Sequence, residues 1–197
     1  IREAHASGCE IKLLAIAQYR DDAHARGVSV RVHPSLVPAD NPLASVHGAF
    51  NAVLIDAEAA GRLMFYGQGA GGAPTASAVL SDVVAAASHR VNGGQAPRES
   101  SYADLPILGP GSAITRYQVQ LRVDDKPGSL AIVAGVFADN DVSIDSVRQS
   151  TYVGGRDAIV TIVTHPAGVF HLDAAVSSLR EEDRVLEVVS VRRVEGQ

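Results

Sequence analysis

A run of glycines between an apolar segment and an alanine-rich segment is the part of this sequence best suited to bind a ligand. The glycines follow the apolar residues 62–66 and stand at Gly67, Gly69, Gly71 and Gly72. Because glycine has no side chain, a flat ligand can approach this backbone to van der Waals distance. A helix is predicted over 74–90, and its first amides would point back toward the same turn, where they can bind an anion.

The literal pattern Gly67-x-Gly69-x-x-Gly72 matches the dinucleotide-binding fingerprint, but its surroundings do not. That fingerprint requires a second parallel strand after the helix and an acidic residue about 20 positions further on, which holds a ribose. Here the helix leads into residues 92–97 (NGGQAP), which are typical of a linker. A tight packing turn between a strand and a helix is the alternative interpretation. We favour a turn that touches a ligand, because four glycines exceed what packing alone requires.

Other residues that could do chemistry lack the spacing of a catalytic or metal site, so we expect no metal and no catalytic residue in this chain. His33 and His47 have no carboxylate nearby in the sequence, and such histidines are more often structural than ligands. Asp40 and Asp56 are not spaced for paired acid–base work on one helix face. We interpret Cys9 as a small buried side chain.

Composition restricts the classes of protein that are possible. The 197 residues allow one large or two small domains, and 46% hydrophobic with 20% charged residues is typical of a soluble globular chain. A net charge of −5 without a basic block argues against nucleic-acid binding. No signal peptide or apolar run long enough to span a bilayer is present, so we expect a cytoplasmic protein without a membrane partner. The chain begins as if inside a helix, and we expect that a preceding part of the protein is absent.

The sequence pattern of residues 1–92 predicts the first of two domains. It is expected to have an antiparallel sheet of three or four strands covered by the helix over 74–90. The strands are predicted from apolar runs and period-two alternation at 10–20, 28–34, 52–57 and 62–66. The polar residues 20–27 predict a hairpin between the first two strands, and the prolines in 35–45 predict an irregular loop.

Residues 93–114 are rich in Gly, Pro and Ser and predict a linker, after which residues 115–197 predict a second domain. Its strands are expected at 117–123, 142–149, 157–164 and 185–194, with helices beginning near Ser129 and spanning 172–180. The order βαββαβ is that of the ferredoxin-like fold, so the whole chain is predicted to be α+β.

The second domain resembles an ACT domain. The resemblance depends on residues 125–131 (DKPGSLA) at the first strand-to-helix turn and on 140–144 (NDVSI) before the second strand. ACT domains commonly bind amino acids at paired interfaces and regulate a neighbouring enzyme. The resemblance therefore implies an allosteric amino-acid site formed by Asp125, Pro127, Gly128, Ser129, Leu130, Val142, Ser143 and Ile144. An ACT domain that only dimerises is the alternative.

The first domain resembles part of the catalytic domain of homoserine dehydrogenase. The matching stretches are 11–17 (IKLLAIA), 30–34 (VRVHP), 43–53 (LASVHGAFNAV) and 65–76 (FYGQGAGGAPTA). Members of that family interconvert L-aspartate 4-semialdehyde and L-homoserine with NADP or NAD. Together with the ACT domain, the resemblance implies an enzyme regulated by an end-product amino acid, with L-threonine as the expected effector. It also implies a homodimer or homotetramer.

The resemblance assigns one cofactor contact and no catalytic residue to this chain. In the family the last glycine of the turn lies against the nicotinamide, and that position matches Gly71. The nucleotide-binding domain and the catalytic lysine precede the matched region, and neither Lys12 nor Lys126 fits the catalytic role, so the chain alone is expected to be inactive. Asn41 replaces a histidine that the family usually has, which argues against an essential acid–base role there. A non-enzymatic, amino-acid-binding regulatory protein is the alternative function.

Overall fold

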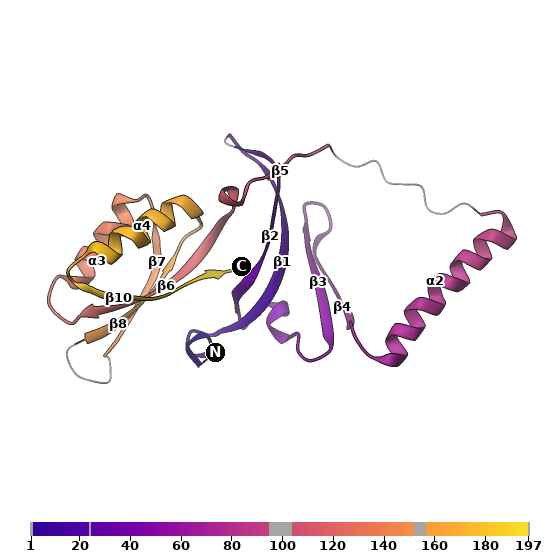
Figure 1. Ribbon diagram of the computed structural model, residues 1–197, viewed down its shortest axis with the longest axis horizontal. Helices are drawn as coiled ribbons and strands as arrows, with labels where there is room; N and C mark the ends of the chain where they lie inside the picture. Colours follow the sequence, from indigo (N-terminus) through magenta and orange to yellow (C-terminus); the bar gives the residue numbers. More distant parts are fainter. Residues whose placement is uncertain (1, 24, 95–103, 152–156, 197) are drawn as a thin grey trace. The chain divides into compact units, whose positions relative to one another are not determined.

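The computed structural model describes residues 2–23, 25–94, 104–151 and 157–196 (Figure 1). The chain divides into two compact units, one containing residues 1–41 with 105–197 and the other residues 42–104. None of the helices in the described part of the chain is long and apolar enough to cross a membrane.

The second half of the chain forms the ferredoxin-like fold that its sequence predicts. The elements are β6 (Ile114–Asp124), α3 (Ser129–Asp139), β7 (Ile144–Thr151), β8 (Asp157–Thr164), α4 (Val169–Glu181) and β10 (Val185–Val194). The strands lie in the order β10-β6-β8-β7, and each neighbouring pair is antiparallel. Two-residue strands, β5 (Ile107–Leu108) and β9 (Ala167–Gly168), pair with β2 and β6 respectively.

The core of the larger unit lies in this half of the chain. Every second residue of β8 is buried, as expected for a strand with one face toward helices. Phe137 of α3 and Leu172 and Leu179 of α4 are at most 1% exposed and belong to the same apolar cluster as Val119 and Leu121 of β6. Burying large apolar side chains of this kind stabilises a fold by about 1.5–3 kcal/mol each.

The N-terminal hairpin extends the same sheet. After the short helix α1 (Arg2–Ala6), strands β1 (Cys9–Asp21) and β2 (Arg26–Pro38) pair along their whole length, and β2 then pairs in parallel with the end of β10. The sequence predicts this hairpin as part of a separate N-terminal sheet. The structure instead joins it to β10 and places the pair β3–β4 in a sheet of its own.

The smaller unit contains few packed elements. It consists of a 3₁₀ turn η1 (Pro42–Ser45), the antiparallel pair β3 (Phe50–Ala57) and β4 (Gly61–Gln68), and helix α2 (Gly72–Asn92). The helix ends where Gly93 adopts a left-handed conformation, with φ of 68°. None of the described residues of α2 is buried, so the predicted packing of this helix on a sheet is not seen within the smaller unit.

Candidate functional site

The glycine-rich turn links β4 to α2, as the sequence predicts, and two of its glycines are required by local geometry. A Cβ on Gly69 would lie 1.6 Å from the side-chain nitrogen of Asn51. Gly71 has φ of 126° and ψ of 146°, a conformation that is accessible essentially only to glycine. In contrast, a Cβ on Gly67 or Gly72 would meet no atom within 4 Å. Packing of the chain therefore explains Gly69, and backbone conformation explains Gly71.

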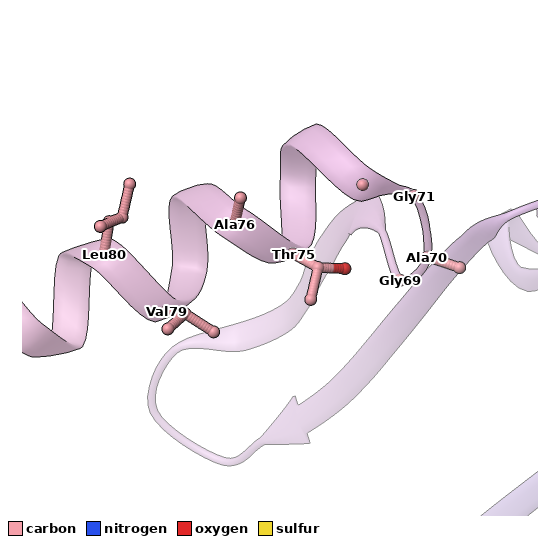
Figure 2. A pocket seen from close by; sticks show the side chains of 8 residues that line it. Gly69, Ala70, Gly71, Thr75, Ala76, Val79 and Leu80 are labelled. Atoms are coloured by element: carbon pink, nitrogen blue, oxygen red, sulfur yellow. The ribbon is translucent and has the colours of Figure 1, made fainter.

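An open, mainly apolar hollow lies beside this turn (Figure 2). Its lining consists of small side chains and bare backbone from Gly69, Ala70, Gly71, Gly72, Thr75, Ala76, Val79 and Leu80. Gly71 precedes the first residue of α2, and no side chain caps that end of the helix. The hollow thus offers a flat apolar wall, one hydroxyl group on Thr75 and free helix amides. These features can contact the face of a flat ligand and donate hydrogen bonds to an oxygen atom that it carries.

The first group of predicted amino-acid-binding residues lies at the turn between β6 and α3. Gly128 has φ of 92° and directly precedes α3, while Asp125 accepts a hydrogen bond of 3.1 Å from Gln149 of β7. Ser129 is 4% exposed, and its Oγ has no hydrogen-bond partner among the described residues. Pro127 and Leu130 lie at the surface of the turn. A buried hydroxyl without a partner is costly, and a polar ligand at this turn could supply the missing hydrogen bond.

Charges at the end of β6 stiffen the same turn. The Lys126 ammonium lies 2.5 Å from an Asp124 carboxylate oxygen, and Arg184 donates to the same oxygen at 3.4 Å. The hydrogen bond from Lys126, followed by the charges of Lys126 and Arg184, holds the pKa of Asp124 below its ordinary value. Both cations are therefore engaged with Asp124, while Asp125 is the carboxylate that faces β7.

The second group, Val142, Ser143 and Ile144, lies at the opposite end of the sheet. Asp124 pairs with Asp157 at the start of β8, whereas Ile144 pairs with Thr164 at its end. Seven residue steps along a strand correspond to about 23 Å. Val142 is buried, whereas Ser143 is exposed. The backbone carbonyl oxygen of Ser143 accepts a hydrogen bond from the backbone amide of His165. A single copy of the chain therefore does not bring the eight predicted residues together.

The remaining candidates have structural partners. Asn41 is buried, and its side-chain amide donates to the carbonyl oxygen of Gly196, so it holds the C-terminal strand end to the loop after β2. His33 contacts Ser35 through Nδ1 at 2.9 Å, and its Nε2 lies 3.6 Å from Glu195. No group of three or more His, Cys, Asp or Glu side chains that could hold a metal occurs among the described residues.

Sequence reasoning missed a polar cluster where β2 meets β10. Arg31 donates to both carboxylate oxygens of Glu195, at 3.1 and 3.3 Å, and the two side chains are 11% and 12% exposed. Arg193 lies across the strands from Tyr117, with its guanidinium carbon 5.9 Å from the ring centre. The period-two spacing of Arg31, His33 and Ser35 indicates that they share one face. It does not indicate that residues 193–195 lie against that face.

The comparisons with known proteins agree with both resemblances. Residues 1–84 match the family model described as homoserine dehydrogenase, and residues 117–183 match the ACT domain. A homoserine dehydrogenase of Mycobacterium tuberculosis is 54% identical over 98% of this chain, and one of Corynebacterium glutamicum is 47% identical over 99%. The chain covers 45% and 44% of these relatives, respectively, and thus spans just under half their length.

A solved structure gives the same result. The crystal structure of a homoserine dehydrogenase from Thiobacillus denitrificans is 34% identical, with a TM-score of 0.83. The match covers 99% of this chain and 44% of that one. The chain therefore belongs to the homoserine dehydrogenase family and carries an ACT domain in its second half.

Proposed function

We propose that this chain is the C-terminal part of an enzyme that interconverts L-aspartate 4-semialdehyde and L-homoserine with NADP or NAD. The observation that carries the proposal is the apolar hollow at Gly71, in a chain that is 54% identical to a homoserine dehydrogenase. We further propose the boundaries 1–92 for the catalytic-domain portion, 93–114 for the linker and 115–197 for the ACT domain. Cys9 is a free thiol, which fits a reducing compartment such as the cytoplasm.

In this proposal the chain contributes one wall of the cofactor site. When bound, the nicotinamide supplies or accepts the hydride. The backbone at Gly71 would lie against the ring, and the small side chains beside it would leave room for the ring to approach. The amides at the start of α2, which no side chain caps, would donate hydrogen bonds to a carboxamide oxygen of the cofactor. The chain supplies no catalytic side chain, so residues 1–197 by themselves are expected to give no turnover.

The ACT domain is proposed to sense an amino acid, with L-threonine as the expected effector, through pairs of chains. Asp125–Leu130 and Val142–Ile144 lie at opposite ends of the sheet, so a site built from both groups requires a second copy. The unpartnered hydroxyl of Ser129 supports a polar ligand at the turn. A homodimer or homotetramer follows from this arrangement. A typical coupling energy of about 1–3 kcal/mol would lower activity by roughly 5- to 150-fold.

The test is a kinetic comparison of glycine variants in the full-length enzyme. Gly71→Val should raise the KM for the cofactor or abolish homoserine-dependent reduction of NADP⁺ or NAD⁺, followed by absorbance. A β-branched residue at this φ also costs about 1–3 kcal/mol of strain, so circular dichroism must show that the variant is folded. Gly67→Ala is the matched control, because its Cβ meets nothing within 4 Å. Unchanged kinetics in Gly71→Val would contradict the assignment of Gly71.

The same assay tests the enzyme class. A full-length protein that shows no oxidation of homoserine with either cofactor would contradict the proposed reaction. It would favour the alternative, an amino-acid-binding regulatory protein without enzymatic activity.

A further inference from the structure

A cavity of about 480 Å³ lies in the larger unit where β2, β10, the start of β6 and the first turn of α4 meet. Its volume is within the range of small-molecule pockets, about 300–1,000 Å³. Tyr117, in its wall, is seven residues from Asp124 along β6, or about 23 Å. It is separated from β7 by the intervening strand β8. The cavity is thus about 23 Å from the first group of predicted ACT-site residues, two strands away from Ile144 of the second group, and in a different unit from the hollow at Gly71.

Buried polar atoms without partners surround this cavity. Tyr117 is 3% exposed, and its hydroxyl group has no hydrogen-bond partner among the described residues. The same is true of Nε of Arg193, the residue paired with Tyr117 across the two strands. Native proteins rarely leave such groups unsatisfied, because each lost its hydrogen bonds to water on burial. Unpartnered donors from two adjacent strands therefore indicate a missing acceptor.

The charges in the wall indicate that this acceptor is an anion. Glu195 is already occupied by Arg31, which donates to both of its oxygens. No carboxylate of the described residues forms an ion pair with Arg193, whose recorded contact is the Tyr117 ring. A guanidinium and a phenolic hydroxyl that line the same cavity can both donate to one carboxylate, and charge-assisted hydrogen bonds are stronger than neutral ones.

The other residues that line the cavity indicate the chemistry of the rest of the ligand. Leu36 and Leu172, each 1% exposed, add apolar surface to the lining of the cavity. Asp173 also lines the cavity, is exposed, and forms no ion pair with any of the described residues. An aliphatic body would contact the leucines, and a positively charged group would interact with Asp173.

We propose that this cavity binds a small aliphatic α-amino acid, with the carboxylate held by Arg193 and Tyr117 and the ammonium group directed to Asp173. Leu36 comes from the segment that matches the dehydrogenase family, and Tyr117 and Leu172 come from the ACT match. A ligand here would contact both matched segments at once. Its binding would stabilise the pairing of β2 with β10, which joins only two pairs of residues.

The test is an NMR titration of the 197-residue chain with L-valine, L-isoleucine, L-threonine and L-methionine. At least one should bind and shift the backbone amides of Tyr117, Leu172 and Arg193. For the ligand that binds, the analogue without the amino group should retain measurable binding, and the analogue without the carboxylate should lose it. An absence of binding by all four amino acids would overturn the proposal.

Variants identify which site is occupied. Arg193→Gln should weaken binding by about 10- to 100-fold, the usual effect of losing a hydrogen bond to a charged group. Tyr117→Phe, which retains the ring and is the variant more certain to fold, should weaken it by roughly 3- to 10-fold. The control Arg180→Gln removes the same charge from an exposed position at the end of α4 and should have no effect.

Asp125→Asn separates this proposal from threonine binding at the ACT turn. If binding in the cavity is correct, Asp125→Asn leaves the affinity unchanged while Arg193→Gln weakens it. The reverse result would overturn the cavity proposal and support the turn between β6 and α3 as the amino-acid site.

Discussion

His33 is the residue whose environment most directly predicts a pH effect on stability. Burial of its imidazole, and then the positive charge of Arg193, hold the pKa of His33 below its ordinary value despite the opposing charge of Glu195. The His33 imidazole therefore binds a proton at a higher pH in the unfolded chain than in the folded chain. The free energy of unfolding should be greatest above about pH 6.5 and should fall as the pH drops below that value.

Urea unfolding of the wild type and of His33→Gln between about pH 5 and about pH 7.5 measures this effect. The variant should show a smaller loss of stability on acidification. His171→Gln, at an exposed position of α4, is the matched histidine control. If the free energy of unfolding changed equally with pH in the wild type and in His33→Gln, the pKa of His33 would not differ between the folded and unfolded chains.

Cys9 should be a slowly reacting thiol. It is partly buried beside Ala4, Leu36 and Val194, and burial, followed by the negative charge of Asp40, raises its pKa. Because the thiolate is the reactive form, alkylation of the folded chain by iodoacetamide near neutral pH should be several-fold slower than in urea. Mass spectrometry over a time course measures both rates. Equal rates would contradict the burial of this thiol.

Strand β2 depends on a glycine at the position where it meets β5. Gly27 has φ of 156°, and a Cβ there would lie 2.4 Å from the carbonyl oxygen of Pro106. That oxygen accepts the backbone hydrogen bond of Val28, so the backbones are already in close contact. Gly27→Ala should therefore lower the free energy of unfolding by about 1–3 kcal/mol, measured by urea denaturation.

The matched control at the element scale is Gly135→Ala in α3. A Cβ at this position meets nothing within 4 Å, and alanine is a better helix former than glycine. It should raise the free energy of unfolding by about 0.5–1 kcal/mol. Loss of stability in both variants would mean that the close contact at Pro106 is not what distinguishes Gly27.

The sequence predicted best those helices and strands whose type and position follow from the local spacing of apolar residues. The period-two pattern of β8 and the start of helix α3 at Ser129 depend on neighbours a few residues away, and both agree with the predicted positions. The pairing of β2 with β10 was missed, because it joins segments about 160 residues apart through two residue pairs. Nothing local in either strand encodes that contact. The cluster of Arg31 and Glu195 was missed for the same reason.

At the scale of the whole molecule, the two units should differ greatly in local stability. The larger unit contains nearly all of the buried apolar side chains, whereas Ala44 is the one buried apolar residue among those described in 42–104. A two-stranded hairpin is marginally stable by itself, and so is a single helix the length of α2. The apolar side chains of Val79, Leu80, Val83 and Val84 are 57–62% exposed. These elements therefore have little tertiary packing to hold them.

Hydrogen exchange of the 197-residue chain should consequently show fast exchange in β3, β4 and α2, and slow exchange in β6 and β8. A difference of about 4 kcal/mol in opening free energy would give roughly a 1,000-fold difference in protection. Equal protection in both units would contradict this expectation.

The same experiment on the full-length protein tests what covers α2. If further polypeptide of the proposed enzyme packs on Val79, Leu80, Val83 and Val84, the amides of this helix should gain protection, while those of β8 should change little. Burial of four such side chains contributes several kcal/mol, at about 1.5–3 kcal/mol each, so the gain should be easily measured. Unchanged fast exchange of α2 in the full-length protein would mean that its apolar face has another partner or none. In that case α2 could not hold the hollow at Gly71 rigidly enough to position a nicotinamide.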